Sequence, residues 1–394
     1  MHLIWRERHI SRADIARRLG LSRSTVTEIV RDLLETGYVV AVGQGESSGG
    51  RRPEVLEFQD DHRHVLGIDI GATHVSVVLM DLAGHVLGWN HRNHGVRNDP
   101  DGTMALMKSL CEEMLEANDV SHAGLIAVGV GAPGPVDADA PGVMSNVVLP
   151  GWKDQNVGES LGGWFGVRAY IENDANLGAL AEMWWGAGRG VRDFMYVKAG
   201  YGVGAGYILD GRVYRGGRGL AGEFGHIPAD PHGPDCVCGL KGCLVTLMGG
   251  EALENRSRQL LPGFPASSLV PATLSLQTVQ DAAVRGDELG QLVIREAAGH
   301  LGRALAGFVN VMDPRMIVLS GSLMRVRQLV LDQVRETVST CVLTQSGKRV
   351  SILGSSLGPQ AVAVGAATLA LDHWVSRPGF YHLQPSAGTG RISV

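Results

Sequence analysis

Four side chains with metal-ligand chemistry lie close together in the second half of the chain. His226 is followed ten residues later by Cys236, and then by Cys238 and Cys243 within the segment CVCGLKGC. One imidazole and three thiolates form a complete tetrahedral set of N and S ligands for zinc and leave no position open for water. Cysteines that are reactive or merely buried are the alternative, but the spacing and the glycine-containing turns favour a structural zinc site.

A second polar cluster follows an apolar stretch that we expect to be a strand: Glu172, Asn173, Asp174 and Asn176. An aspartate at the C-terminal end of a strand can take the proton from an attacking hydroxyl in phosphoryl transfer. Equally, asparagine and aspartate can hydrogen-bond the hydroxyls of a sugar. They can also simply cap the helix that we expect to begin near Ala175. The segment alone leaves these alternatives open.

The elements that must position these side chains are predicted to be α/β. Two stretches begin alike, with a buried strand, a glycine loop and further strands: VLGIDIG at 65–71 and FMYVKAGYGVG at 194–204. Residues 101–118 are predicted to be helical. The recurrence predicts two halves built from one duplicated α/β unit. A polar segment at 59–64 separates them from what precedes.

The N-terminal segment has a different pattern. Ser11 is followed three residues later by an acid, which predicts a capped helix that Gly20 ends, and Ser22 can cap a second helix. Two short apolar runs, 38–42 and 55–58, flank a glycine-rich connection and predict a hairpin. The combination is typical of a winged helix-turn-helix. An ordinary helical hairpin with solvated arginines is the alternative.

The first 52 residues carry nine arginines and six acids, a balance of +3, whereas the whole chain has a net charge of −5. The second helix would place its N-terminal residues in the major groove, and the wing would bring two arginines to the minor groove. An exposed acid, Glu28, opposes this interpretation mildly. The candidate DNA-binding residues are Arg23, Ser24, Thr25, Thr27, Arg31, Arg51 and Arg52.

Composition excludes several classes of protein. Of the 394 residues, 44% are hydrophobic and 19% charged, which is typical of a folded chain with a full core. No apolar run reaches the roughly 20 residues that span a bilayer. The first eight residues lack the apolar core of a signal peptide. We therefore expect a cytoplasmic protein without a membrane partner.

Taken in order, the motifs resemble those of the ROK family of repressors, open reading frames and kinases. They are SRADIARRLGLSRSTVTEIV, SSGGRRP, GIDIGATH, GAPGPVD, LPGW, ENDAN, GLAGEFGH and CVCGLKGC, spread over roughly residues 8–372. The resemblance implies an actin-like ATPase fold of two α/β lobes with a cleft between them, preceded by the winged helix-turn-helix. It also implies zinc at the four ligands above and a homodimer or homotetramer.

The resemblance also implies a ligand site and a division of the chain. The implied sugar contacts are Asn173, Asp174, Glu223 and His226, with backbone help near Gly131. The implied domains are a DNA-binding head at 1–60 and a sugar-binding body at 61–394, with lobes at about 61–180 and 181–375 and a tail at 376–394.

Two glycine loops that hold nucleotide phosphates in the family's kinases are altered in this chain. In the first loop Asp69, Gly71 and Thr73 match the kinase pattern, but Ala72 and His74 replace the usual glycine and lysine. A phosphate cradle depends on exposed backbone amides, so larger side chains weaken it.

In the second loop Tyr201 stands where these kinases have threonine. In the adenosine loop Ser320 and Ser322 flank Gly321 where the kinases have a glycine run. The sugar side departs once, because Val245 replaces a glutamate of the family and removes one acceptor for sugar hydroxyls.

Three hypotheses follow. The first is a sugar-responsive transcription regulator, a repressor of carbohydrate-metabolism genes that a sugar or sugar phosphate releases from operator DNA, and therefore not an enzyme. The second is an ATP-dependent, hexokinase- or glucokinase-like sugar kinase with Asp174 as its base. The third is a DNA-binding protein whose sugar site has decayed, for which Val245 is the only hint.

Overall fold

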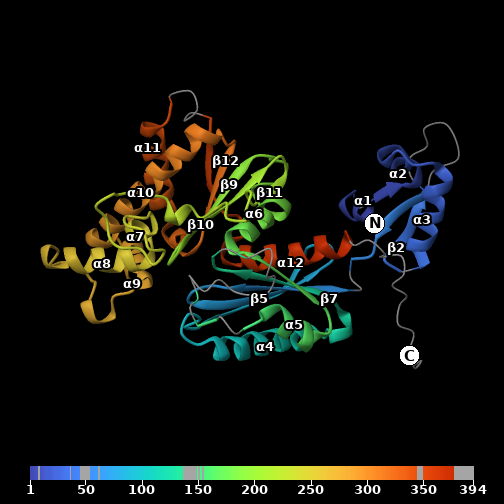
Figure 1. Ribbon diagram of the computed structural model, residues 1–394, viewed down its shortest axis with the longest axis horizontal. Coiled ribbons are helices and arrows are strands. Elements are labelled where there is room, and N and C mark those ends of the chain that lie inside the picture. Colours follow the sequence, from blue (N-terminus) through green and yellow to red (C-terminus); the bar gives the residue numbers. More distant parts are fainter. Residues whose placement is uncertain are drawn as a thin grey trace.

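The computed structural model describes residues 1–7, 9–35, 37–44, 54–60, 63–134, 136, 149, 151–152, 155–343 and 349–376. They form a small N-terminal head and two α/β lobes (Figure 1). The wing arginines Arg51 and Arg52 and the tail from residue 377 lie outside the described residues. No helix in the described ranges combines the length and apolar character needed to cross a membrane.

The head contains the predicted helix pair and hairpin. Ser11 caps the first helix of the pair, Arg12–Leu19, by accepting a hydrogen bond from the amide of Asp14. Gly20 ends this helix in the left-handed conformation, with φ of 65°. The three strands form a sheet in the order β1-β3-β2. The elements are α1 (His2–Glu7), β1 (His9–Ser11), α2 (Arg12–Leu19), α3 (Arg23–Glu35), β2 (Val39–Gln44) and β3 (Glu54–Phe58).

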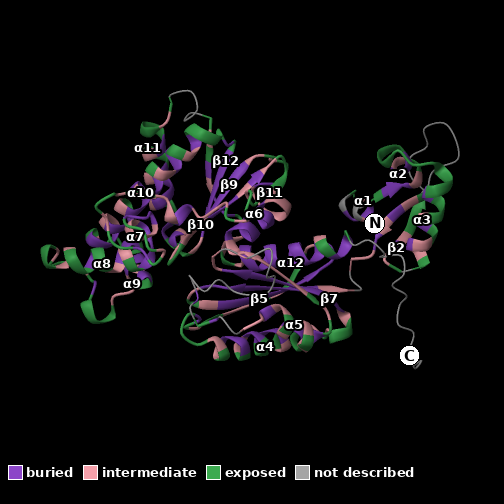
Figure 2. Ribbon diagram, viewed as in Figure 1, coloured by how far each residue is buried: buried purple, intermediate pink, exposed green. Residues whose placement is uncertain are grey.

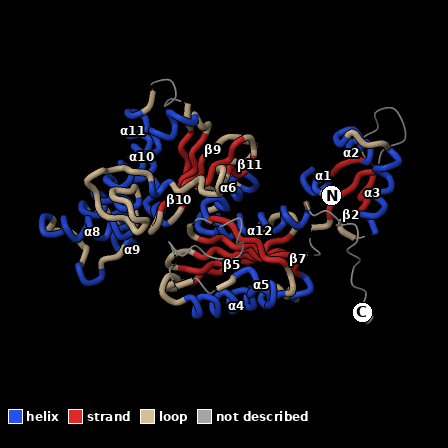
Figure 3. Tube along the Cα trace, in the orientation of Figure 1, coloured by secondary structure: helices blue, strands red, loops and turns tan. Residues whose placement is uncertain are grey.

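The first lobe is a five-stranded sheet in the order β6-β5-β4-β7-β8. Helices α4 and α5 cover one face of this sheet, and the last helix, α12, covers the other (Figures 1 and 3). Its elements are β4 (His64–Ile70), β5 (His74–Asp81), β6 (Val86–Asn93), α4 (Pro100–Ala117), β7 (Leu125–Ala132), α5 (Val157–Phe165), β8 (Arg168–Asn173) and α12 (Ala361–Val375).

The second lobe repeats this topology, with a sheet in the order β11-β10-β9-β12-β13. In both sheets the three meander strands pair antiparallel and the remaining strands pair parallel, which confirms the predicted duplication. Its elements are α6 (Asp174–Trp185), β9 (Phe194–Ala199), β10 (Val203–Leu209), β11 (Arg212–Tyr214), α7 (Val245–Met248), α8 (Gly250–Leu260), α9 (Leu276–Val284), α10 (Glu288–Met312), β12 (Met316–Ser320), α11 (Arg327–Cys341) and β13 (Ser351–Gly354).

Alternate residues of β9 face opposite sides of the second sheet, as strand geometry requires. Tyr196 packs in a cluster with Ala179 of α6, whereas Met195 and Val197 pack in the cluster that includes residues of α10. Figure 2 shows the resulting pattern of buried sheets with helices that are exposed on their outer sides.

Helices α6 and α12 cross between the two sheets. Their backbones approach so closely that a Cβ on Gly365 of α12 would lie 1.9 Å from the carbonyl oxygen of Leu177 in α6. One helix covers the second sheet and the other covers the first, so this crossing is where the two lobes meet.

The head packs directly against the ends of these two helices. The indole N–H of Trp5 donates to the carbonyl of Leu82 at 2.6 Å, and its ring lies 4.9 Å from that of Trp184 at the end of α6. The ring of Tyr38 meets Trp374, near the end of α12, edge-on at 5.0 Å. Head and first lobe therefore share one hydrophobic cluster.

Candidate functional site

The face of α3 that points away from the head's core is polar and exposed. Val26, Val30 and Leu33 are buried, whereas Arg23, Ser24, Thr25, Thr27 and Arg31 are all exposed. The hydroxyl of Ser22 caps the helix by accepting from the amide of Thr25 at 3.1 Å. Within the described part of the chain, the guanidinium of Arg23 has no ion-pair partner. This geometry leaves the N-terminal turn of α3 free to contact a nucleic acid.

The four predicted metal ligands lie together. The ligand atoms of His226, Cys236, Cys238 and Cys243 all lie within 4.8 Å of one another. Nδ1 of His226 is 3.4 Å from the sulfur of Cys236, and the sulfurs of Cys238 and Cys243 are 3.6 Å apart. Burial lowers the pKa of His226, which favours the neutral imidazole that a metal needs. The described residues thus contain a cluster that can bind a metal ion.

The turns around this cluster need glycine. Gly239 and Gly242 have φ values of 89° and 60°, and a Cβ on Gly242 would lie 1.5 Å from the carbonyl oxygen of Asp230. Only a residue without a side chain fits there. The tight turn that glycine allows brings the sulfur atoms of the cysteines close together.

A cleft of about 2500 Å³ extends between the two lobes and reaches the metal cluster. It is larger than a typical pocket for one small molecule, which has roughly 300–1000 Å³. Asn173, Asp174, Glu223 and His226 line it, as do the residues of the altered glycine loops. Gly131 itself packs against Val362 and Leu177, and the neighbouring Pro133 and Gly134 line the cleft instead.

The polar residues at the start of α6 have well-defined partners. Oδ1 of Asn173 caps the helix by accepting from the backbone amides of Ala175 and Asn176, and its side-chain Nδ2 donates to the carbonyl of Gly134 at 3.0 Å. The capping alternative is therefore confirmed for Asn173. Burial raises the pKa of Glu223, and the carboxylate of Asp174 raises it further.

A lysine that the sequence analysis did not single out lies at the centre of the cleft. Nζ of Lys198, on β9, is 2.8 Å from Oδ2 of Asp174 and 3.7 Å from Oδ1 of Asp69. Asp69 lies at the end of β4 and also contacts Nε2 of His74 at 3.1 Å. The available signal was a charged residue inside an apolar strand that runs into a glycine loop.

The opposite charges of Asp69 and Lys198 stabilise each other's ionised form. Burial alone would raise the pKa of Asp69, but the attraction of Lys198 and His74 outweighs it and lowers the pKa to about 2. Burial alone would lower the pKa of Lys198, but Asp174 and Asp69 raise it. Asp69 and Lys198 therefore remain ionised through the neutral pH range.

The residues that depart from the kinase pattern lie against the glycine loops. The ring of His74 lies over Gly71, where a Cβ would be 2.2 Å from Cε1 of the imidazole. A Cβ on Gly200 of the second loop would likewise be 2.7 Å from the hydroxyl of Ser322, and a Cβ on Gly250 of α8 would be 2.5 Å from Cδ2 of Tyr201. Side chains that depart from the kinase pattern therefore lie against glycines of both loops and of α8.

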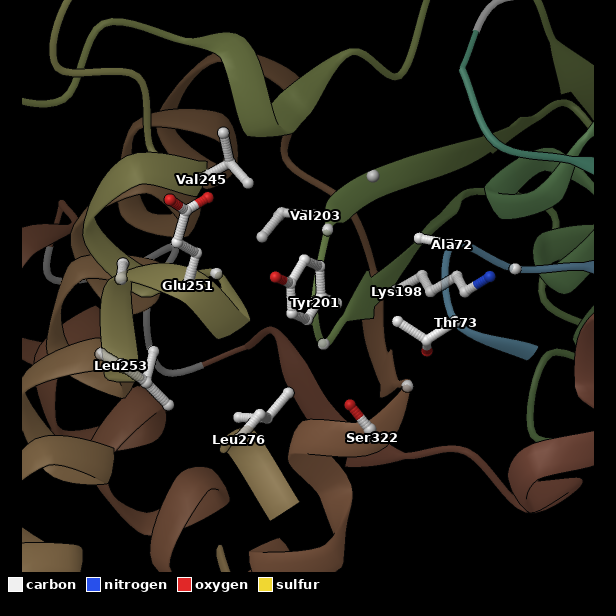
Figure 4. Close-up of a pocket in the computed structure, with 18 of the residues that line it drawn as sticks. Ala72, Thr73, Lys198, Tyr201, Val203, Val245, Glu251, Leu253, Leu276 and Ser322 are labelled. Carbon is white, nitrogen blue, oxygen red and sulfur yellow. The ribbon is translucent and has the colours of Figure 1, made fainter. Parts of the chain in front are cut away.

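Figure 4 shows Tyr201 standing between two parts of the cleft. On one side are Val203, Val245 and Leu253, and on the other are the first loop and Lys198. Val245, which replaces the family's glutamate, lines this side of the cleft, and Figure 4 shows the carboxylate of Glu251 on the same side. Position 245 itself offers no acceptor, but Glu251 keeps a carboxylate at this end of the cleft.

Comparisons with known proteins show which families and regulators the chain is similar to. Residues 65–373 match the model of the ROK family, and residues 1–40 match a model of winged helix-turn-helix DNA-binding domains. The chain is 32% identical to the xylose repressor of Bacillus subtilis over 93% of this chain and 92% of that protein. It is 31% identical to the DNA-binding transcriptional dual regulator NagC of Escherichia coli, over 91% and 88%.

Two solved structures are similar along most of the chain. A ROK family transcriptional regulator, a homologue of the Escherichia coli MLC protein, superposes with a TM-score of 0.74 at 26% identity and covers 91% of this chain and 90% of its own. A ROK family glucokinase from Streptomyces griseus, solved with glucose and AMPPNP, superposes with a TM-score of 0.71 at 28% identity. It covers 99% of its own chain but 78% of this one.

Proposed function

The chain belongs to the ROK family, and we propose that it is a sugar-responsive transcriptional repressor whose affinity for operator DNA falls when a sugar occupies the cleft. The observation that carries this proposal is the combination of a winged helix-turn-helix head with a body in which His74 and Ser322 lie against glycines of the two phosphate loops. The carboxylates that would face a sugar remain in the same cleft.

DNA binding is assigned to the exposed face of α3. Arg23 would contact guanine in the major groove, with Ser24, Thr25 and Thr27 beside it, and Arg31 would reach a phosphate. The wing arginines Arg51 and Arg52 would enter the minor groove. The similarity to repressors along nine-tenths of the chain supports this assignment.

Phosphoryl transfer is the second candidate, because Asp174 is present and a glucokinase of the family is structurally similar. Two features oppose it. His74, Tyr201 and Ser322 occupy the space above glycines of the loops and of α8. Oδ2 of Asp174 also accepts a hydrogen bond from the ammonium of Lys198 at 2.8 Å, so this oxygen is already engaged.

The sugar site would comprise Asp174, Glu223 and His226, with Asn173 and the backbone near Gly131 shaping its floor. The ion at the cluster would be zinc, because one imidazole and three thiolates match its tetrahedral preference. Zinc would fix the imidazole through one nitrogen and so set the position of the other. It would also tie the loop that carries Glu223 to the fold.

The head is placed where it can sense the angle between the lobes. It contacts the end of α6, which covers the second sheet, and the end of α12, which covers the first. Residues at the start of α12, Ala361 and Val362, line the cleft. Closure around a sugar would change the crossing of these helices and thereby the orientation of the head. This proposal keeps the domains at 1–60 and 61–394 and a homodimer or homotetramer that presents its heads to DNA. The lobe bounds expected from the sequence, about 61–180 and 181–375, are corrected at two helices, because α6 packs on the second sheet and α12 returns to the first.

Operator binding with and without sugar tests the proposal. Footprinting upstream of the gene and of neighbouring carbohydrate genes should find a protected inverted repeat. D-Xylose, D-glucose or N-acetyl-D-glucosamine should weaken that binding by about 5- to 150-fold, the usual range of coupling between two sites. A protein that protects no site, or whose operator affinity no sugar changes, would contradict the proposal.

The kinase alternative needs its own assay. With ATP and the same sugars, we expect turnover far below the roughly 1–100 per second of typical kinases. Turnover in that range would favour the second candidate. Asp174→Asn is the matched variant, because it removes a catalytic base while preserving the shape of the side chain.

A further inference from the structure

The ammonium of Lys198 lies near two carboxylates, those of Asp69 and Asp174, which come from different elements of the fold. Asp69 comes from the first sheet, Asp174 begins α6, and Lys198 belongs to the second sheet. The side chain of Lys198 is 21% exposed, that of Asp174 13% and that of Asp69 3%. The ammonium is thus largely buried but keeps one side open to the cleft.

We propose that Lys198 is a ligand-binding residue that donates a hydrogen bond to a hydroxyl oxygen of an uncharged sugar, and that its site rejects phosphorylated sugars. This inference rests on the proposed function and specifies the class of effector. An ammonium has three N–H donors. One is directed to Asp174 at 2.8 Å, and Asp69 is too distant, at 3.7 Å, for a normal hydrogen bond.

A buried carboxylate oxygen near Lys198 lacks a hydrogen-bond donor in the described structure. Oδ1 of Asp69 is buried without a hydrogen-bond partner in the described structure, and Asp69 lines the cleft. A buried carboxylate oxygen left unpaired is costly. A sugar hydroxyl placed beside Lys198 accepts from the ammonium through its oxygen and donates its own hydrogen to one of the two carboxylates. When Oδ1 of Asp69 turns toward the cleft and takes that hydrogen, one hydroxyl group satisfies both the open donor and the unpaired acceptor.

The charge balance decides against an anionic ligand. A lysine beside two glycine loops would by itself favour a phosphate. Lys198, Ala72 and Thr73 line the same cleft (Figure 4). Here two carboxylates face the one ammonium, so the formal charge of the three groups is −1, and a protonated His74 beside Asp69 would bring it only to zero. A sugar phosphate would thus find no net positive charge here, whereas a neutral sugar needs none.

Arg97 offers the competing interpretation. It is exposed, lines the cleft and lies near enough to Tyr201 to influence that phenol electrostatically. If the effector carried a phosphate, Arg97 is one of several guanidiniums of the cleft lining that could bind it. The experiment must therefore compare Lys198 and Arg97 with the same ligands.

Calorimetric titration of the full-length protein makes the comparison. The probes are D-glucose, D-xylose, N-acetyl-D-glucosamine, glucose 6-phosphate and N-acetylglucosamine 6-phosphate. We expect at least one neutral sugar to bind, its phosphate to bind at least tenfold more weakly, and Lys198→Met to lower the affinity for the neutral sugar by about tenfold or more. Lys198→Arg keeps the charge and should recover part of the loss.

Matched controls separate this role from structural damage. Lys108→Met removes an exposed lysine of α4 and should leave sugar affinity unchanged. If Lys198→Met does not fold, Lys198→Met combined with Asp69→Asn is compared with Asp69→Asn alone, so that the difference in sugar affinity between the two variants belongs to Lys198. Arg97→Ala should not alter binding of the neutral sugar.

Each contrary outcome points to a different error. Equal affinity of the native protein and Lys198→Met for the neutral sugar overturns the role of Lys198 while leaving the proposed function intact. Tighter binding of a phosphate that Arg97→Ala abolishes overturns the assignment of a neutral effector. A native protein that binds none of the probes overturns the proposed function and, with it, this inference.

Discussion

The sulfurs of Cys238 and Cys243 lie 3.6 Å apart, a separation at which two thiolates repel unless a cation lies between them. We expect one zinc ion per chain and its loss in Cys238→Ser, with a lower Tm because structural metal binding contributes to folding. Elemental analysis and calorimetry of untagged protein measure both. Cys341→Ser, at an exposed cysteine remote from the cluster, is the control. Unchanged metal content in Cys238→Ser would contradict the assignment.

The depressed pKa of Asp69 gives a prediction about pH. Because the folded value of about 2 lies below the ordinary value of 3.8, ionised Asp69 stabilises the fold above pH 4 and loses this effect as the pH falls toward 2. Relative to Asp69→Asn, the native protein should gain on the order of 2 kcal/mol at pH 7, and about half of that near pH 3. Urea unfolding between pH 3 and pH 7 measures the difference. A gap that widens on acidification would refute this explanation.

Arg23 should carry sequence preference. Arg23→Ala is expected to relax discrimination at one base pair by about 1–3 kcal/mol, because a bidentate contact to guanine is lost. Binding to a set of single-substituted operators measures this. Arg285→Ala, which removes an exposed arginine of the body, should change nothing. Unaltered preference in Arg23→Ala would show that another residue of α3 reads the base.

Single residues also show where sequence reasoning stops. The four metal ligands were predictable because three of them lie within eight residues and share one chemistry. The partners of Lys198 were not, because Asp69 lies in the other lobe and only the fold brings it to β9. The overlap of His74 with Gly71 depends likewise on a turn geometry that the residue types do not specify.

Among the elements, helices whose ends are marked by capping residues were predictable from the sequence. Helices that depend on packing against distant parts of the chain were not. Ser11 and Gly20 marked both ends of α2 in the sequence. Helix α1 has six residues, too few to be stable alone, and it depends on the packing of Trp5 against Leu82 and Trp184. The return of α12 to the first sheet is likewise a property of the topology rather than of its periodicity.

The two aromatic contacts of the head should carry the response to sugar. Trp184→Ala and Trp374→Ala should each reduce the effect of sugar on operator affinity several-fold while sugar affinity stays within about threefold of native. Operator titrations with and without sugar, beside calorimetry of sugar binding, give both quantities. Trp89→Ala, at an exposed tryptophan of the edge strand β6, is the control. A full response in both variants would exclude this route.

At the scale of the whole molecule, one head presents a single short helix, which is too small a surface for tight and selective binding. We expect the body to form dimers, and the operator to contain two half-sites separated by whole turns of DNA. Light scattering gives the mass of the protein, and operators with 5 base pairs inserted between half-sites should bind far more weakly. A monomer that binds one half-site as tightly as two would contradict this expectation.

The crossing of α6 and α12 would also convert a small tilt of α12 into a larger displacement of the head. Helix α12 has 15 residues, so it is about 22 Å long. If its cleft end is held, a tilt of about 5° displaces its far end, and the head against it, by roughly 2 Å. Hydrogen bonds to base edges weaken within a few tenths of an ångström. If the protein binds its operator as a dimer, as we propose, a movement in the cleft much smaller than the sugar itself would be enough to take both recognition helices out of register with their half-sites.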